Sequence, residues 1–335
     1  MPEATIVGID YVLPQQKTTN QELEERHPEW QMDQVVLRTG VESRQWCRED
    51  ETALDLAEAA VRRLADRLAA DIDLVDTILF CTQSPDHVMP PNATLLQHRL
   101  GLKKSVAALD YTLACSGYVY GLFLAKALLR SEMTSNIVLV TSETYSKWMN
   151  PNDRGPATLF GDGAAATWIT AGDTGIGEFV LGTDGGNAGC FIVPAGGARQ
   201  PMPDAMSQLV EDASGGVRTP RNLAMNGAAV LDFVKREIPQ TVAGLFNKTN
   251  LSMEDIDLVI FHQASRLTLD LLNRALRVPS SKQFSNIAHI GNTVSASIPI
   301  ALRDAEIQGV LKPGMQVLVV GFGVGLSWGA TLLRW

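Results

Sequence analysis

A five-residue motif occurs twice in this chain, and the distance between its copies limits the folds that the chain can adopt. The copies are Asp71-Ile-Asp-Leu-Val75 and Asp255-Ile-Asp-Leu-Val259, and each leads into an apolar run that ends in a polar turn. Their separation is near half of the 335 residues, which is too long for a solenoid repeat. We therefore predict a duplicated α/β unit with halves 1–172 and 173–335, with chance similarity of two common apolar patterns as the alternative.

The rest of the sequence alternates short β-branched runs with longer amphipathic segments, which is typical of an α/β fold with largely buried strands. The pattern predicts strands at 5–9, 77–81, 106–109, 136–141, 164–169, 258–262, 316–321 and 329–334. It predicts helices at 51–70, 91–100, 116–129, 228–245, 266–276 and 298–306. Residues 185–221 are rich in Gly, Pro, Ala and Ser, which indicates an extended loop.

Charge and composition exclude several classes of protein. The net charge is −9 and no basic block offsets it, which argues against a nucleic-acid partner. No apolar run approaches the ~18 residues that span a bilayer, and the N-terminal residues lack the pattern of a signal peptide. We expect a cytoplasmic protein without a membrane segment. The cysteines lie far apart without the spacing of a zinc site, so we expect no metal and reduced thiols.

Three side chains with complementary chemistry lie at strand ends or beside glycine: Cys115, His262 and Asn292. We expect Cys115 in the first turn of the helix predicted at 116–129, where the helix dipole and free amides favour a thiolate. An imidazole and a carboxamide can both donate hydrogen bonds to a carbonyl that is becoming an oxyanion or an enolate. Together the three groups predict an enzyme that transfers acyl groups through a covalent intermediate.

Several short motifs, taken in their order and spacing, resemble one known family. They are Leu37-Arg-Thr-Gly-Val41, Ala114-Cys-Ser-Gly117, Asn152-Asp-Arg-Gly155, Phe160-Gly-Asp-Gly-Ala164, Met225-Asn-Gly227, His262-Gln-Ala264, Gly291-Asn-Thr293 and Gly321-Phe-Gly-Val-Gly-Leu-Ser-Trp-Gly329. Each motif alone is weak, but the set resembles β-ketoacyl-acyl-carrier-protein synthase III in the thiolase superfamily. The resemblance covers nearly the whole chain. It implies a thiolase-like fold of duplicated α/β halves, layered α-β-α-β-α.

The resemblance also implies a role for each motif. Cys115 would take the acyl group from a thioester, while His262 and Asn292 would bind the carbonyl of a malonyl donor. The backbone amides of Cys115 and Val324 would form the oxyanion hole. The residues that would bind substrate or coenzyme A are Arg38, Arg154, Ser265 and Arg266. Met89 falls where the family inserts a residue into the acyl pocket of the partner subunit, which implies a homodimer.

Some positions depart from the family pattern. Ser265 replaces an asparagine, and the arginine expected two residues after it stands one residue earlier, at Arg266. Gln34 replaces a tryptophan that stacks on adenine, although Trp30 lies nearby. A lysine is replaced by Asp232, whose charge would repel an acidic carrier protein. These departures suggest altered handling of coenzyme A and carrier.

The motifs therefore predict a decarboxylating condensation of acyl-coenzyme A with a malonyl thioester, which gives a 3-oxoacyl product. Coenzyme A thioesters are substrates here, and no resident cofactor is expected. The sequence leaves open the acyl chain length, the pathway, and whether the malonyl group is carried by acyl carrier protein or coenzyme A. One alternative is acyl transfer from Cys115 to an amine or hydroxyl without carbon–carbon bond formation. Another is a catalytically silent subunit of a condensing complex.

Overall fold

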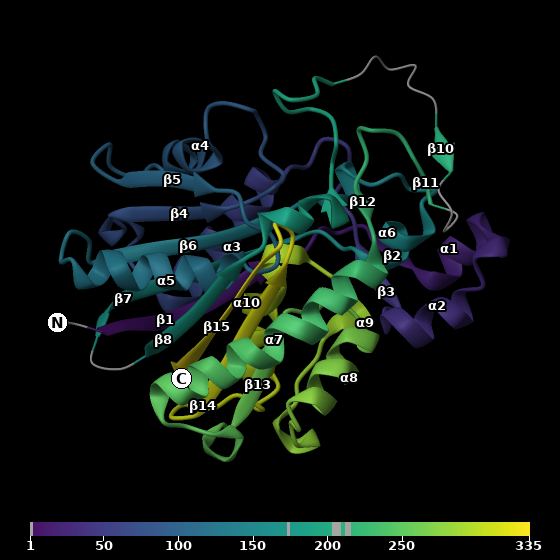
Figure 1. The fold of residues 1–335 in the computed structure, drawn as a ribbon. Helices are drawn as coiled ribbons and strands as arrows, with labels where there is room; N and C mark the ends of the chain where they lie inside the picture. The colour runs from purple at the N-terminus through teal and green to yellow at the C-terminus, as the bar shows by residue number, and fades with distance from the viewer. Residues whose placement is uncertain (1–2, 173–174, 203–208, 212–215) are drawn as a thin grey trace.

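Two sheets form the frame of the molecule in this computed structural model, which describes residues 3–172, 175–202, 209–211 and 216–335 (Figure 1). The first sheet has the strand order β1-β7-β6-β4-β5, and the second has the order β13-β14-β15-β8. The strands of the first sheet are β1 (Glu3–Val12), β4 (Thr77–Cys81), β5 (Ala107–Tyr111), β6 (Asn136–Glu143) and β7 (Gly163–Gly172). Those of the second are β8 (Ile176–Thr183), β13 (Leu258–Phe261), β14 (Gln316–Gly323) and β15 (Ser327–Arg334).

The two sheets repeat one pairing scheme. β1 pairs antiparallel with β7, β7 pairs antiparallel with β6, and β6 pairs parallel with β4. In the second sheet β8, β15, β14 and β13 follow the same order with the same directions. Even the parallel edge strand β5 has a remnant counterpart, a single parallel bridge between Val259 and Gln283. The duplicated α/β fold predicted from the sequence is therefore confirmed.

The repeated five-residue motif, however, aligns the two halves in the wrong register. Asp76 and Asp257 are the equivalent residues, since each precedes a strand and binds the start of a neighbouring strand. The amide of Asp76 donates to the carbonyl oxygen of Asn136 at 3.1 Å, and the amide of Asp257 donates to that of Gln316 at 2.8 Å. The motif would instead equate Asp73 with Asp257. Relative to its copy of the motif, the helical turn before β13 (Met253–Asp255) therefore lies three residues earlier than the turn before β4 (Ile72–Leu74).

Helices cover both sheets and also separate them (Figure 1). α5 and α10 contact strands of both sheets and form the middle layer, α3 packs on the first sheet, and α7 packs on the second. A helix enclosed between two sheets has no polar face, and most of the α5 sequence GYVYGLFLAKALLR is apolar. The helices with a predicted counterpart are α3 (Ala53–Leu68), α4 (Asn92–Arg99), α5 (Gly117–Arg130), α7 (Gly227–Thr249), α8 (Arg266–Ala275) and α10 (Ser297–Ile307).

Several short elements and one edge strand lie outside the predictions from sequence. They are β2 (Lys17–Thr19), α1 (Asn20–Arg26), α2 (Met32–Thr39), β3 (Ser43–Gln45), α6 (Arg154–Leu159), β8, β9 (Phe191–Ile192), β10 (Val210–Glu211), β11 (Val217–Arg218), β12 (Ala224–Met225) and α9 (Ile287–Ile290). The predicted loop at 185–221 contains three of the two-residue strands, and parts of it lie outside the described residues. No helix within the described ranges is long and apolar enough to cross a membrane.

Candidate active site

Cys115 lies between β5 and α5, in the seam between the two halves. Ser116 is the N-cap of α5 and Gly117 its first helical residue, so the thiol precedes the helix rather than occupying its first turn. The predicted position was wrong because the chain turns irregularly over residues 112–116 before the helix begins. The backbone amides of Cys115 and Val324 lie near enough to the sulfur to lower the pKa of the thiol. These are the two amides that the resemblance assigned to an oxyanion hole.

The end of β14 packs closely against Cys115. A Cβ atom at Gly323 would lie 2.8 Å from the Cβ and 2.9 Å from the Sγ of Cys115. A Cβ atom at Gly321 would lie 2.8 Å from the carbonyl oxygen of the same residue. Both contacts are shorter than side chains tolerate, so glycine is required here for the backbone to approach. This approach brings the amide of Val324 to the sulfur.

The resting thiol is neutral, contrary to the expectation from a helix terminus. Burial raises the pKa of the Cys115 thiol well above its ordinary value, and the nearby carboxyl of Glu143 raises it further. The two backbone amides act in the opposite direction but are outweighed. The cause is the loss of hydration: Cys115 is only 3% exposed, and an ion loses more from burial than a neutral thiol does.

His262 follows β13 directly and is held by contacts on two sides. Its Nδ1 lies 2.6 Å from the hydroxyl oxygen of Ser297, and its ring meets the edge of Phe322 at 5.5 Å between centroids. The amide of Gln263 donates to the same hydroxyl oxygen at 3.4 Å, and the hydroxyl proton of Ser297 can in turn be donated to Nδ1. In that arrangement the ring proton is on Nε2. Burial lowers the pKa of His262 to about 3, so the imidazole is neutral near pH 7.

Asn292 is fixed by the backbone of the chain around α6. Its amide donates to the carbonyl oxygen of Leu159 at 2.9 Å, and its carbonyl oxygen accepts from the amide of Gly161 at 3.0 Å. In the side chain, Oδ1 accepts from the amide of Val294 at 2.9 Å, and Nδ2 donates to the carbonyl oxygen of Ala264 at 3.4 Å. The second proton of Nδ2 can then be donated to a ligand in the cavity.

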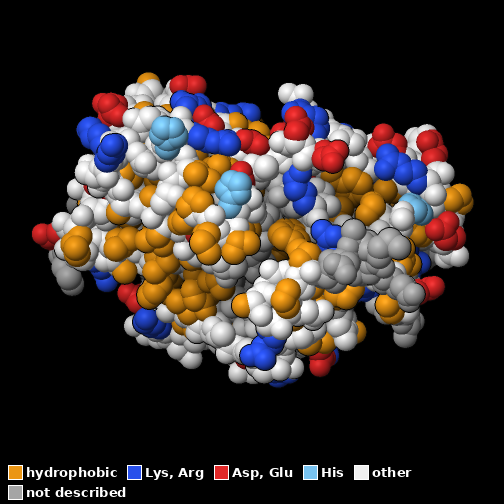
Figure 2. All heavy atoms as spheres, turned by 90° about the horizontal axis from the view of Figure 1, so that it is seen from above, with side chains coloured by type: hydrophobic (Ala, Val, Ile, Leu, Met, Phe, Trp, Pro, Cys, Tyr) orange, Lys and Arg blue, Asp and Glu red, His pale blue; other side chains and the backbone are white. Residues whose placement is uncertain are grey.

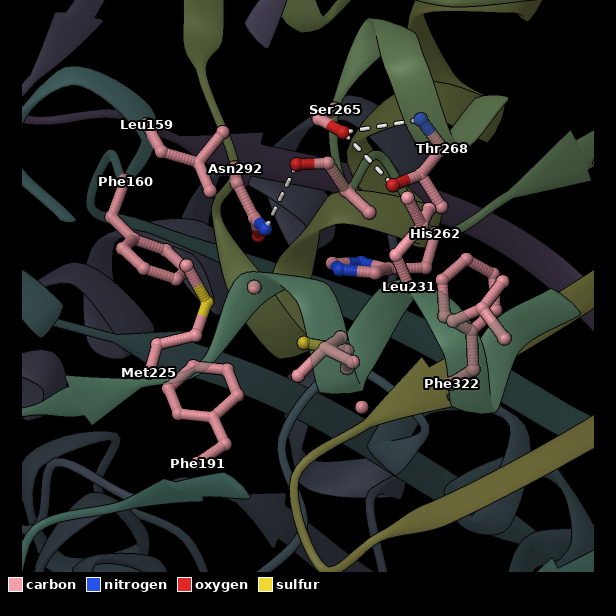
Figure 3. A pocket seen from close by; sticks show the side chains of 16 residues that line it. Leu159, Phe160, Phe191, Met225, Leu231, His262, Ser265, Thr268, Asn292 and Phe322 are labelled. Carbon is pink, nitrogen blue, oxygen red and sulfur yellow. Dashed lines mark hydrogen bonds between the residues drawn. The ribbon is translucent and has the colours of Figure 1, made fainter. Parts of the chain in front are cut away.

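Cys115, His262 and Asn292 line one cavity of about 100 Å³ (Figure 3). The other walls are mostly apolar, with Phe191 and Phe322 among them. A wider cleft of about 820 Å³ shares six lining residues with this cavity and so adjoins it: Leu159, Met225, Gly227, Leu231, Ser265 and Thr268. A thioester could therefore reach the thiol through the cleft while its carrier stays outside.

The cleft contains three of the four residues expected to bind substrate or coenzyme A. Arg38 on α2, Arg154 at the start of α6, and Ser265 all line it. Arg266 instead lines a separate groove of about 280 Å³ beside Gly40, and Leu267 lines the cleft. One residue along a helix corresponds to a rotation of ~100°, which explains why the shifted arginine points elsewhere.

Met89 does not line the cavity of its own chain. It lies in the loop between β4 and α4 and is 80% exposed, and its neighbour Val88 is 93% exposed. Two such apolar side chains at a loop tip are unusual in a surface that contacts only water.

The chain was then compared with known proteins. Residues 109–185 match the family model described as 3-oxoacyl-[acyl-carrier-protein (ACP)] synthase III, and residues 246–335 match the model of its C-terminal part. A β-ketoacyl-[acyl-carrier-protein] synthase III of Clostridioides difficile (strain 630) is 33% identical over 99% of this chain and 98% of its own length. The β-ketoacyl-[acyl-carrier-protein] synthase III 3 of Streptomyces coelicolor is 32% identical over 99% of this chain and 97% of its own length.

Solved structures show the same likeness in three dimensions. A crystal structure of a 3-oxoacyl-(acyl-carrier-protein) synthase III superposes with a TM-score of 0.97 at 42% identity, and each chain is covered in full. The synthase III of Thermus thermophilus gives a TM-score of 0.86 at 32% identity, with 99% of each chain covered. The chain thus belongs to the β-ketoacyl-acyl-carrier-protein synthase III family of the thiolase superfamily.

Two neighbours of the site were missed in the sequence, and a third, Trp30, was noted without a role. Trp30 lines the cleft, as Gln34 does, and stacks on His27 with ring centroids 4.0 Å apart. Ser297 binds His262, and its only signal was a polar stretch shortly after Asn292. Glu143 is buried at the end of β6, where its sequence suggests only a strand that ends in a polar turn.

Proposed function

We propose that this chain catalyses the decarboxylative condensation of an acyl-coenzyme A with a malonyl thioester. The observation that supports this most strongly is the convergence of Cys115, His262 and Asn292 on one cavity, with two backbone amides near the sulfur. The relatives, named as β-ketoacyl-acyl-carrier-protein synthases III, support the same activity. The reaction needs no resident cofactor or metal.

In the first half-reaction the sulfur of Cys115 attacks the thioester carbonyl of acyl-coenzyme A. The carbonyl oxygen becomes an oxyanion, and the amides of Cys115 and Val324 are the donors that would stabilise it. The bond from the carbonyl carbon to the coenzyme A sulfur breaks as the bond to Cys115 forms. Because the resting thiol is neutral, its proton leaves with coenzyme A as the free thiol.

In the second half-reaction a malonyl thioester occupies the cavity. The ring proton on Nε2 of His262 and the free proton on Nδ2 of Asn292 are donated to its carbonyl oxygen. The bond to the carboxylate breaks, carbon dioxide leaves, and its electron pair forms an enolate that these donors stabilise. The enolate carbon attacks the acyl group on Cys115, and the released thiolate takes up a proton. The neutral imidazole keeps one ring N–H, which is sufficient for this donation.

The wide cleft supports a role in binding the carrier of each thioester. Arg38 and Arg154 are exposed there and can pair with phosphate groups of coenzyme A, while Ser265 lies nearer the cavity. The groove position of Arg266 does not favour the same role for that residue. The malonyl carrier is either coenzyme A or an acyl carrier protein.

Acyl transfer to an amine or hydroxyl without decarboxylation is the weaker alternative. None of the relatives described above is named for such a reaction. Release of one carbon dioxide for each acyl group cleared from Cys115 would exclude it.

We also propose that the functional unit is a homodimer in a reducing, cytoplasmic compartment. β5 is an edge strand, and Leu109 on it and Phe123 on α5 are each 41% exposed. Figure 2 shows hydrophobic side chains gathered over the part of the molecule that contains these elements. An uncovered apolar edge of this kind favours pairing with another chain, which would carry Met89 toward the partner's acyl pocket. Light scattering would measure the mass of the assembly.

Intact-protein mass spectrometry tests the main proposal. The protein is incubated with a panel of acyl-coenzyme A thioesters and then with malonyl-coenzyme A or malonyl-carrier protein. We expect a mass gain on Cys115 that the malonyl donor clears with release of carbon dioxide. The Cys115→Ala variant should gain no mass but still decarboxylate the malonyl thioester. Normal condensation by that variant would show that the covalent mechanism is wrong.

A further inference from the structure

Glu143 is a fully buried acid that the proposed mechanism does not use. It is the last residue of β6 and has no solvent exposure. Its Oε2 accepts from the amide of Gln83 at 3.0 Å and from the hydroxyl of Ser84 at 3.2 Å. Its Oε1 accepts from the hydroxyl of Ser295 at 2.8 Å. The side chain thus joins two segments that are more than two hundred residues apart in sequence.

The segment bound through Ser295 is the turn that follows Asn292. Val294 in this turn has φ +55°, a left-handed conformation that is costly for a β-branched residue. The amide of Val294 donates to Oδ1 of Asn292, so the strained residue holds the catalytic carboxamide directly. Ser295, the next residue, is held by Glu143. Without that bond the turn could relax, and the carboxamide would move with it.

The other bound segment starts the loop that contains Met89. The hydroxyl oxygen of Ser84 also accepts from the amide of Thr144 at 3.2 Å, so this loop is tied to the end of β6 by more than one bond. Glu143 therefore lies between the loop that starts at Gln83 and the turn that contains Asn292.

We propose that Glu143 is a positioning residue that fixes Asn292 for decarboxylation by holding the strained turn at Ser295. The proposal rests on the function proposed above for Asn292. Glu143 does not touch substrate, and its effect passes through Ser295 and Val294.

The charge of Glu143 also affects Cys115. The hydrogen bonds of Glu143 support decarboxylation, whereas its negative charge disfavours the thiolate of Cys115. Burial raises the pKa of Glu143 to about 8, so it is mainly protonated at neutral pH and ionised at pH 9. When ionised it raises the pKa of Cys115 by repulsion between like charges. The other titratable groups that interact with this cluster are Cys81, Tyr111, Tyr145 and Asp162.

Two substitutions separate the hydrogen bonds that Glu143 accepts from the effect of its charge. Glu143→Gln keeps an oxygen for the amide of Gln83 and an amide group that can donate to Ser295, but it removes the charge. Glu143→Ala removes the hydrogen bonds to both segments, the one at Gln83 and Ser84 and the one at Ser295. We expect Glu143→Ala to lower kcat for decarboxylation of malonyl-coenzyme A by about tenfold, with KM changed by less than about twofold. We expect Glu143→Gln to stay within about threefold of the natural chain at pH 7.

The alkylation rate of Cys115 supplies a second readout. Damage to the structure around the site would not be expected to change it as the loss of the charge does. At pH 9 we expect iodoacetamide to alkylate Cys115 about threefold faster in Glu143→Gln than in the natural chain, because the repulsion between the Glu143 carboxylate and the thiolate is removed. A damaged or loosened site would not combine faster alkylation with nearly normal decarboxylation at pH 7.

Two further variants complete the test. Ser295→Ala removes only the bond to the Asn292 turn and should lower decarboxylation by about threefold to tenfold even if Glu143→Ala does not fold. Ser142→Ala is the matched control, since this buried serine on the same strand bonds to the carbonyl oxygen of Ala53 instead. The inference is wrong if Ser295→Ala decarboxylates as fast as Ser142→Ala. If the natural chain does not decarboxylate malonyl-coenzyme A at all, the proposed function fails instead.

Discussion

The hydroxyl oxygen of Ser297 lies 2.6 Å from Nδ1 of His262, whose ring lines the same cavity as Cys115. Ser297 is the first residue of α10, so a helix in the middle layer sets the orientation of an imidazole that follows β13. The contact decides which nitrogen of the neutral ring holds the proton. When the hydroxyl of Ser297 donates to Nδ1, Nε2 holds the proton and can donate to a substrate carbonyl.

Replacing Ser297 by alanine should therefore reduce decarboxylation without preventing acylation of Cys115. The ring would lose the bond that fixes its tautomer, and we expect kcat for decarboxylation to fall by about tenfold. Stopped-flow detection of carbon dioxide measures this step, and mass spectrometry follows the acylation. Ser142→Ala serves as a control for loss of a buried serine hydroxyl. An equal loss in both half-reactions would contradict a role through His262.

Gly323→Ala should stop acylation of Cys115. The added methyl group would lie under 3.0 Å from both the Cβ and the Sγ of the nucleophile, so the strand must shift and carry the amide of Val324 away. We expect the free energy of unfolding to fall by about 1–3 kcal/mol. Gly189→Ala is a suitable control because its methyl group would meet nothing within 4 Å. Normal acylation of Gly323→Ala would show that the close approach is not required.

Arg38→Ala should weaken binding of acyl-coenzyme A more than it slows the chemistry. Arg38 is exposed in the cleft, remote from the sulfur, so we expect KM to rise by about tenfold at low salt with kcat nearly unchanged. The difference from the natural chain should shrink as salt is added, because screening weakens the lost attraction. Arg62→Ala on α3 is the control. A fall in kcat at constant KM would argue against phosphate binding by Arg38.

Glu143→Gln should change how stability depends on pH. The pKa of Glu143 is raised to about 8 in the folded chain from 4.5, so folding favours the protonated acid. Its contribution to stability is fully present below pH 4.5 and is lost as pH rises through 8. The Tm of the natural chain should therefore fall relative to that of the variant by several degrees over this range. A constant difference in Tm would contradict the raised pKa.

Much of the frame could be predicted from sequence because burial leaves a strong pattern. The strand at Thr77–Cys81 was predicted with its exact limits, since all five side chains are buried and flanked by polar residues. α1 and α2 are only seven and eight residues long and give little periodic signal. The strand Ile176–Thr183 is at a sheet edge with mostly half-buried residues, so neither alternation nor a continuous apolar run marks it.

The site was only partly predictable for a different reason. Cys115, His262 and Asn292 each stand in a motif, and the structure places them on one cavity as expected; their catalytic roles stay predictions. Trp30 lines the cleft together with the glutamine at position 34. A motif compares residues position by position, so it could not show that a residue four positions earlier reaches the same cleft. Glu143 and Ser295 meet across 152 positions, and such a contact depends on how the two halves dock.

The two halves supply different parts of the centre around Cys115, and this has a consequence for a chain that is still being made. The thiol belongs to the N-terminal half, which is synthesised first. The amide of Val324 directly follows β14 and belongs to the C-terminal half, which is synthesised later. Until that strand packs beside α5, the thiol lacks one of the two amides proposed to stabilise the oxyanion, and it lacks both His262 and Asn292. A nascent chain therefore has little capacity to capture acyl groups prematurely, and acylation reports that both halves have closed on each other.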